Sequence, residues 1–547
     1  MIRTTLLTLL IAITVNAQET QLGRVEFPTS GSPAAQAHFL RGLAALHSFW
    51  YEEALDAFRD STKVDPDFMM GYWGEAMTCN HPLWSEQDLD AARLVIAKIK
   101  DTPKLTDRER AYLNAVKILY GDGDKRARDV AYSAAMEKVY RAYPEDLDAA
   151  AFYSLSLLGL MRPGDKGYRL QAQAGAIALA VYEKNPNHPG AAHYIIHAFD
   201  DPDHAILALP AARRYADIAP EAHHARHMPS HIFLQLGMWP EAAASNESAW
   251  ESSDNWMRQK KLPLSVRDYH SLHWLMYAYL QQGRYNKAEQ LLKLMKQVMA
   301  ESTYDNKLRP DYYENNYANM AAAFVVETER WDLANELFPV SKTPAPSEQA
   351  QDGGHGTHGS TSMPNGSAPT TSGPATSTVR YSSANRTLPP FIRALSASIR
   401  GSKDVETGLS GIRELEVAAV SASVSNDYAK ATELMKNATA LEEETGAPSG
   451  PPSLIKPTHE LFGEILLKAG KPADAAAQFR VALLRQPNRA RSLLGLARAA
   501  AQSGDHATAA STYTKFLEQW KQADEGLPEL REARGYLKTH PEISRGN

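Results

Sequence analysis

A period of 34 residues near the C-terminus constrains the fold of this chain more than any other feature. Gly470 and Gly504 are 34 positions apart, and each is followed by an alanine five residues later and an aromatic residue nine residues later. Such spacing predicts pairs of antiparallel helices, because glycine ends a helix in the left-handed conformation without strain. One pair cannot bury its apolar face alone, so neighbouring pairs must stack into a solenoid.

The same template recurs closer to the N-terminus. Clear copies contain Gly42, Gly237 and Gly283, and weaker copies surround Trp331 and Tyr428. This period, with small residues where helices cross, resembles the tetratricopeptide repeat. The predicted fold is therefore all-α: a tetratricopeptide-repeat α-solenoid of stacked helical hairpins, in two segments joined by a disordered linker.

Two stretches are expected to lie outside the solenoid. Residues 1–17 have the positive charge, apolar run and small-residue cleavage site of a signal peptide, which predicts a periplasmic or secreted protein. The apolar run is too short for a membrane anchor. Residues 341–386 are rich in Gly, Ser, Thr and Pro and predict a disordered linker between an N-terminal solenoid (18–340) and C-terminal repeats (387–541).

The overall charge suggests no charged macromolecule as a partner. The formal net charge is −6 over 547 residues, so nothing indicates binding to nucleic acid. The only cysteine, Cys79, cannot form an intramolecular disulfide.

Histidine is concentrated in one part of the chain. Ten of the 18 histidines lie within residues 188–273. They form pairs three or four residues apart, which places the members of each pair on one face of a helix. Counted from Gly237 and Gly283, the faces of His227 and His231 and of His270 and His273 point into the concave groove, while the loop length leaves the register of His193 and His197 undetermined by one residue. Pro229, between His227 and His231, predicts a kink in their helix.

This arrangement is suited to a transition metal. Neutral imidazole binds zinc, copper and iron, and two or three helices could supply four ligands. The predicted ligands are His193, His197, His227, His231, His273 and Asp200. Asp201, followed by Pro202, instead fits a helix cap. There is no HExxH motif to indicate a zinc protease.

A groove that binds a peptide or small ligand is the alternative use of these residues. Amide, aromatic and imidazole groups can contact a peptide backbone. The candidate contacts are Trp73, Asn80, His81, His270, Asn316 and Asn319. The tryptophans could equally belong to the core, the commoner position of a large aromatic residue.

Several longer motifs resemble a group of exported bacterial tetratricopeptide-repeat proteins. They are YWGEAM (72–77), HAFDDPDHA (197–205), HMPSHIF (227–233), KPTHELFGE (456–464) and PNRARSLLGLARAA (487–500). The resemblance implies the fold and its groove and assigns no reaction. The sequence thus favours an exported scaffold that binds a protein, peptide or small ligand. The alternative is a metal-binding protein or a metal-dependent oxidoreductase or hydrolase, with Asp200 or Asp201 as a general base.

Overall fold

The computed structural model describes residues 21–162, 167–301, 312–339, 387–402, 405 and 408–540. The predicted signal peptide and the whole of the predicted linker lie outside these residues. None of the described helices is both long and apolar enough to cross a membrane.

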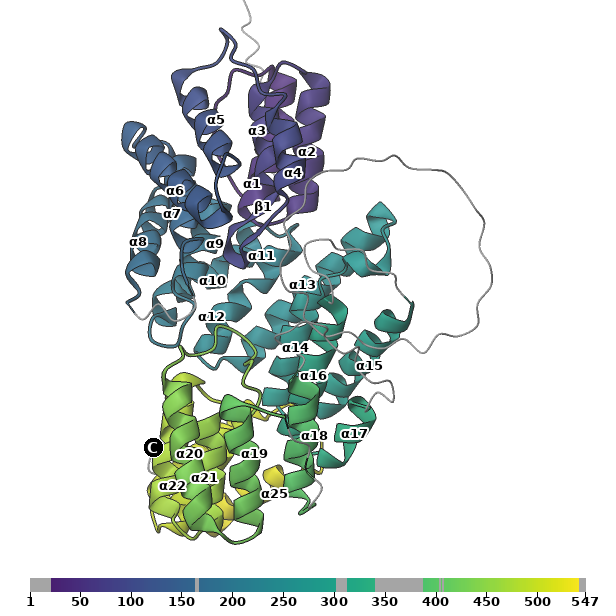
Figure 1. Ribbon diagram of the computed structural model, residues 1–547, viewed down its shortest axis with the longest axis vertical. Helices are drawn as coiled ribbons and strands as arrows, with labels where there is room; N and C mark the ends of the chain where they lie inside the picture. Colours follow the sequence, from purple (N-terminus) through teal and green to yellow (C-terminus); the bar gives the residue numbers. More distant parts are fainter. Residues whose placement is uncertain are drawn as a thin grey trace, which may run out of the picture.

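The described part of the chain is almost entirely helical, which confirms the predicted fold class (Figure 1). Successive helices pair as hairpins that stack on one another. The helices before residue 340 are α1 (Pro33–His47), α2 (Tyr51–Val64), α3 (Met69–Met77), α4 (Leu89–Ile96), α5 (Asp107–Leu119), α6 (Lys125–Ala142), α7 (Leu147–Leu158), α8 (Arg169–Lys184), α9 (Pro189–Ala198), α10 (Ala205–Ile218), α11 (His223–His227), α12 (Pro229–Gln235), α13 (Trp239–Lys260), α14 (Tyr269–Gln281), α15 (Tyr285–Glu301), α16 (Tyr312–Thr328) and α17 (Ala334–Leu337).

The helices after residue 386 continue the same stack. They are α18 (Leu388–Ile399), α19 (Gly411–Val424), α20 (Tyr428–Glu443), α21 (Thr458–Lys468), α22 (Pro472–Arg485), α23 (Ala490–Gln502), α24 (His506–Gln519) and α25 (Pro528–Thr539). Since α16 packs directly on α18, the repeats on the two sides of the predicted linker adjoin one another. Three short 3₁₀ turns, η1 (Pro82–Trp84), η2 (Leu264–Val266) and η3 (Trp331–Leu333), and one hairpin of β1 (Asn80–His81) with β2 (Glu86–Gln87) complete the regular structure of the described residues.

An aromatic residue held between two glycines explains the repeat template. The ring of Phe479 on α22 lies against Gly463 on α21 and Gly495 on α23, and a Cβ at either glycine would overlap it. Phe58 on α2 lies in the same way against Gly42 and Gly74. The ring thus fills a notch formed by the first helices of its own and the next hairpin. This packing allows close approach of the backbones without leaving a void.

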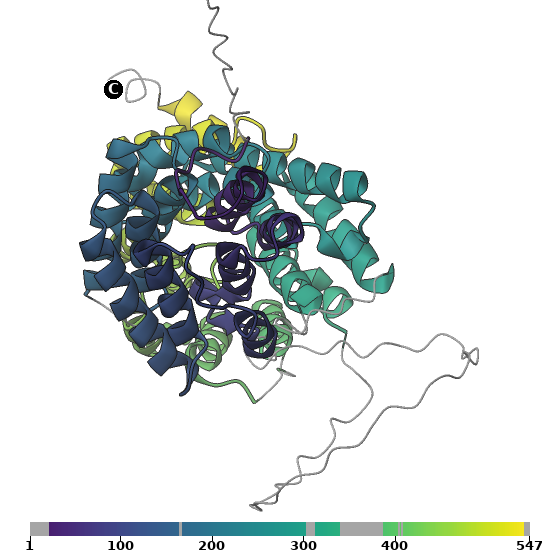
Figure 2. The same cartoon turned by 90° about the horizontal axis from the view of Figure 1, so that it is seen from above.

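The solenoid curves so far that its C-terminal helices contact helices from the middle of the chain. Viewed from above, the helices follow a broad arc, and the C-terminal helices lie beneath the N-terminal half (Figures 1 and 2). Trp239 Nε1 donates to the carbonyl of Asn488 at 2.9 Å, and Trp520 Nε1 donates to the carbonyl of Gln281 at 3.0 Å. These contacts join segments about half the chain apart in sequence.

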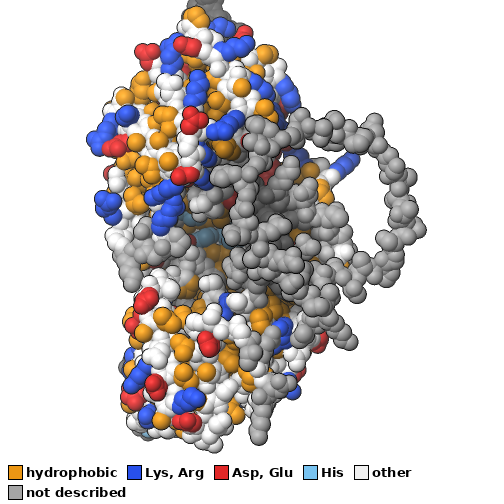
Figure 3. All heavy atoms as spheres, viewed as in Figure 1, with side chains coloured by type: hydrophobic (Ala, Val, Ile, Leu, Met, Phe, Trp, Pro, Cys, Tyr) orange, Lys and Arg blue, Asp and Glu red, His pale blue; other side chains and the backbone are white. Residues whose placement is uncertain are grey.

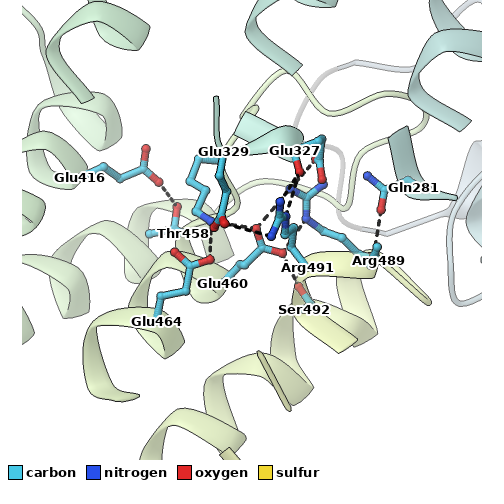
Figure 4. A network of polar contacts seen from close by, with 12 residues as sticks. Gln281, Glu327, Glu329, Glu416, Thr458, Glu460, Glu464, Arg489, Arg491 and Ser492 are labelled. Carbon is cyan, nitrogen blue, oxygen red and sulfur yellow. Dashed lines mark hydrogen bonds and ion pairs between the residues drawn. The ribbon is translucent and has the colours of Figure 1, made fainter. Parts of the chain in front are cut away.

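A buried ionic network stabilises this contact between the C-terminal repeats and the middle of the chain (Figure 4). Arg489 is fully buried and pairs with Glu460 at 2.7 Å and Glu327 at 2.6 Å, while its Nη1 donates to the Tyr277 hydroxyl at 2.8 Å. Arg491 donates to the backbone carbonyl of Glu327 at 2.6 Å. The guanidinium groups on α23 therefore join the C-terminal repeats to α14 and α16.

Candidate functional site

Six histidines from three consecutive hairpins meet inside the solenoid. Helix α9 carries His193 and His197, α11 carries His224 and His227, and α12 and α14 carry His231 and His270. They form two groups, which we call the first triad (His193, His197, His224) and the second triad (His227, His231, His270). Within each triad one nitrogen per ring lies within 4.8 Å of the others. Histidine side chains are visible in the hollow between the two halves of the molecule (Figure 3).

Local sequence explains why the second triad converges. Pro229 has no N–H, so the regular helix is interrupted at Met228 between α11 and α12. Met228 nevertheless keeps helical dihedral angles, φ −53° and ψ −36°. The predicted interruption is present, and His227 and His231 still lie side by side, with their Nε2 atoms 3.1 Å apart.

Hydrogen bonds on the outer side of three rings determine where their protons lie. His231 Nδ1 is 2.6 Å from the carboxylate of Asp200, and His193 Nδ1 is 2.7 Å from the carbonyl of His47. His227 Nδ1 is 2.6 Å from Asn246 Oδ1, whose amide is oriented by donation from Nδ2 to the carbonyl of Ala242. All three partners are acceptors, so each Nδ1 carries the proton and donates it.

The consequence is that unprotonated nitrogens face each other. In the neutral form, both His227 and His231 have a lone pair on Nε2, and these two atoms are 3.1 Å apart with no proton between them. A cation between the two nitrogens would remove this repulsion. Two imidazole nitrogens bound tetrahedrally to one metal at about 2.0–2.1 Å lie roughly 3.3 Å apart, close to the observed spacing.

Burial favours the uncharged form of five of these six rings. Loss of solvation, followed by the influence of neighbouring groups, lowers the pKa of His193 and of His227 to about 3. Burial also lowers the pKa of His197, His224 and His270 well below the usual value. Neutral imidazole is the form that binds a metal, so these five rings need no deprotonation to bind one at neutral pH.

Aromatic residues cover the two triads. The ring centroid of Trp274 is 4.1 Å from that of His231 and 5.0 Å from that of His227. Phe49 lies 4.3 Å from His193 and has a φ of +54°. This left-handed conformation is unfavourable for a bulky residue, by about 1–3 kcal/mol, and such strain concentrates at functional sites.

The C-terminal half also reaches the cluster. Gln235 Nε2 lies 3.2 Å from Asp200 Oδ1 and donates to the carbonyl of Pro448 at 2.9 Å. Gly450 packs against the Trp274 ring, where a Cβ would lie 2.6 Å from Cζ2. The loop between α20 and α21 therefore extends over the second triad.

The predicted metal ligands are partly reassigned by the structure. His193, His197, His227 and His231 come together as cluster residues, and Asp200 lies behind His231 as its hydrogen-bond acceptor. His273 belongs to neither triad. On α14, the two residues that face the cluster are His270 and Trp274, four positions apart. Because successive residues of an α-helix are rotated by about 100°, His273 points in a different direction from Trp274.

Two histidines belong to the cluster although the predicted ligand set lacks them. His270 was expected to contact a ligand in the groove, and it lies in the second triad. His224 is absent from the predicted ligand set. It precedes His227 by three residues and His231 by seven, a spacing that indicates the same helix face. Asp201, predicted to cap a helix, instead caps the turn before α10 by accepting from the backbone N–H groups of Asp203 and His204, and His204 is the N-cap residue of α10.

The predicted groove contacts other than His270 lie elsewhere. Trp73 is 1% exposed among Phe27, Phe39 and Tyr112, so it is a core residue and not a ligand contact. Asn80 is buried, and its Oδ1 accepts from Gln87.

The other three are engaged locally. The ring of His81 stacks on that of Tyr51 with the centroids 4.0 Å apart. Asn316 and Asn319 donate to carbonyls of their own helix, those of Tyr312 and Asn315. One of the two amide N–H groups of each side chain is therefore used within α16.

A third buried group supports the cluster from behind. Asp148 Oδ1 lies 2.9 Å from His47 Nε2 and 3.4 Å from His188 Nε2, and His47 Nδ1 is 2.9 Å from the Tyr194 hydroxyl. Although burial opposes it, hydrogen bonding to both rings lowers the pKa of Asp148. This network fixes His47, whose backbone carbonyl orients His193.

Comparison with known proteins identifies the repeat. The tetratricopeptide repeat family model matches residues 461–524, which comprise most of α21 and all of α22–α24. No curated protein matches the chain.

Similar solved structures include the APC/C hetero-tetramer Cut9–Hcn1, with 11% identity, coverage of 92% of this chain and 76% of the other, and a TM-score of 0.34. Yeast Tom70 has 10% identity, coverage of 93% and 89%, and a TM-score of 0.23. The TPR domain of P58(IPK) has 12% identity, coverage of 94% and 99%, and a TM-score of 0.20.

Proposed function

We propose that this chain is a metal-binding tetratricopeptide-repeat protein whose second triad binds a transition metal ion. The observation that carries the proposal is the 3.1 Å distance between the Nε2 atoms of His227 and His231, whose Nδ1 atoms both face hydrogen-bond acceptors. Outer hydrogen bonds that fix ring tautomers are the usual support of metal-bound histidine. A histidine pair that served only the core would be expected to share a proton between its rings.

The ligand set restricts which metal is bound. Imidazole nitrogen suits zinc, copper, nickel and iron, and three neutral histidines leave a fourth position for water or a substrate. Zinc sites with three protein ligands are typical of catalysis, whereas structural zinc sites usually have four. This supports a reactive or exchangeable metal and leaves the reaction unassigned.

The fold adds an expectation about partners. Tetratricopeptide repeats generally bind proteins or peptides, and a partner of that kind would suit a metal carrier. Export by the predicted signal peptide is part of the proposal. Mass spectrometry of the mature N-terminus after expression in a bacterial host would test cleavage after Ala17.

Metal analysis of the purified full chain tests the proposal directly. The protein is loaded separately with zinc and copper, passed over a desalting column and analysed by mass spectrometry for both metals. The double variant His227→Ala/His231→Ala should lose bound metal, while His506→Ala, which changes an exposed histidine on α24, should keep it. Less than about a tenth of an equivalent in the unmodified protein, or unchanged binding in the double variant, would overturn the proposal.

A further inference from the structure

We propose that the histidine cluster holds two metal ions, one in each triad, joined by a small anion from solution. This inference rests on the proposed metal site of the second triad and adds a second ion, a bridge and a magnetic coupling.

The first triad has the features of a ligand set in its own right. His193 donates from Nδ1 to the His47 carbonyl, so its Nε2 is unprotonated, and this atom lies 3.1 Å from His197 Nε2. Nε2 of His224 is buried and has no hydrogen-bond partner among the residues that the structure describes. An unsatisfied buried nitrogen is unfavourable by about 1–3 kcal/mol, which a metal bond would offset.

The two triads are close enough to share a ligand. The ring centroids of His197 and His231 are 5.7 Å apart, and those of His224 and His227 are 5.8 Å apart. Paired metal ions in proteins usually lie about 3.5–4 Å apart. Rings at these centroid distances, each with its ligating nitrogen about 2 Å from its own metal, fit such a pair.

Charge indicates what the bridge must be. Neutral imidazole brings no charge to a metal site, so two divalent ions would bring four positive charges into a buried site. Two carboxylates lie around the second triad: Asp200 accepts from His231, and Asp268, which also contacts His223 at 3.2 Å, interacts electrostatically with His227 and His270. Four positive charges against two negative ones leave an excess that favours a bound anion.

Coordination leads to the same conclusion. Each triad supplies three ligands, and a fourth is needed for tetrahedral geometry. Asp200 is already engaged by His231 Nδ1 on the outer side of the ring, and Asp268 accepts from the backbone N–H of Ser271 at the start of α14. A small anion such as hydroxide or azide, placed between the triads, would complete both ions at once.

Copper(II) gives this proposal a readout beyond metal content. The full-length protein is loaded with copper(II), its copper is counted by elemental analysis, and its electron paramagnetic resonance signal is integrated. About two copper ions per chain are expected. The signal should be well below the copper content, because two copper(II) ions that share a one-atom bridge couple their spins. Azide should add a charge-transfer absorption band.

Variants of one triad separate this proposal from the proposed function. His193→Ala/His197→Ala should bind about one copper per chain with full signal intensity, and so should His227→Ala/His231→Ala, while His506→Ala should behave like the unmodified protein. If the unmodified protein binds one copper ion with full signal intensity, and only the change of His227 and His231 removes it, the proposal of a second ion is wrong and the proposed function stands. Two copper ions with full intensity would overturn the bridge. No bound metal would overturn the proposed function itself. The unmodified protein alone decides these outcomes if a variant fails to fold.

Discussion

Replacing Asn246 by leucine isolates the hydrogen bond that fixes the His227 tautomer. Asn246 is fully buried on α13, and its Oδ1 accepts from His227 Nδ1 at 2.6 Å. Leucine has nearly the same shape but no acceptor. His227 is then free to move its proton to Nε2 and donate it to His231, while Ser230 Oγ, 3.5 Å from Nδ1, becomes the available donor to that atom.

The expected effect is large on metal binding and small on folding. Loss of an outer partner of a metal-bound histidine lowers affinity by about 10–100-fold, or about 1.4–2.7 kcal/mol. The metal-free protein loses one buried hydrogen bond, worth about 0.5–1.5 kcal/mol, and also loses the repulsion between two lone pairs. Its free energy of unfolding should therefore change by less than its metal-binding free energy.

Competition with a chromophoric chelator measures the affinity, and denaturant unfolding of the metal-free protein measures stability. Asn319→Leu is a matched control, because Asn319 makes the same bond to the carbonyl four residues earlier and contacts no cluster histidine. If Asn246→Leu kept its affinity within about threefold, or if Asn319→Leu lost as much, the tautomer argument would be wrong.

Three further results are expected. Arg489→Ala should lower the free energy of unfolding by about 3–5 kcal/mol in urea titrations, because it leaves two buried carboxylates without a partner. The control Arg498→Ala breaks a half-exposed pair with Glu532 and should lower it by at most about 1 kcal/mol. Equal losses would refute the argument that the buried network joins the C-terminal repeats to the middle of the chain. Gly495→Ala should cost about 1–3 kcal/mol by overpacking the notch that holds Phe479, and an unchanged urea midpoint would contradict it. Burial lowers the pKa of His273 to about 4, so between the ordinary value near 6.5 and that pKa the unfolded chain binds more protons than the folded one. Burial shifts the pKa of five cluster histidines in the same direction: His193, His197, His224, His227 and His270. On acidification from pH 7 to pH 5 the metal-free protein should therefore lose stability, with a slope below about pH 6.5 that approaches about 1.4 kcal/mol per pH unit for each such histidine, and a flat profile would contradict this.

The repeat architecture was accessible from sequence because its physics is local. A glycine at the end of one helix and an aromatic residue in the next recur at fixed spacing, and the notch around Phe479 depends only on neighbouring hairpins. The inward direction of His227 and His231 followed from the same register, whereas that of His193 and His197 did not, because the loop length left their register undetermined by one residue.

The remaining features depend on contacts that no local pattern encodes. The partner of His193 is the carbonyl of His47, 146 residues away, and the Tyr277 partner of Arg489 is 212 residues away. Stacking rules define the contact between neighbours, but the total curvature that brings the chain's end to its middle accumulates over many small rotations. The prediction that His273 is a metal ligand is wrong because a spacing of three residues from His270 does not decide which of two neighbouring side chains faces the cluster. Trp274, not His273, takes that position.

Anomalous diffraction from crystals of the zinc-loaded full chain tests the central claim most directly, because it locates the metal. The account predicts a peak between His227 and His231, about 2.0–2.1 Å from the Nε2 atom of each ring, with His270 as the third ligand. A zinc-saturated crystal with its peaks elsewhere on the chain, and with a proton shared between His227 and His231, would contradict it.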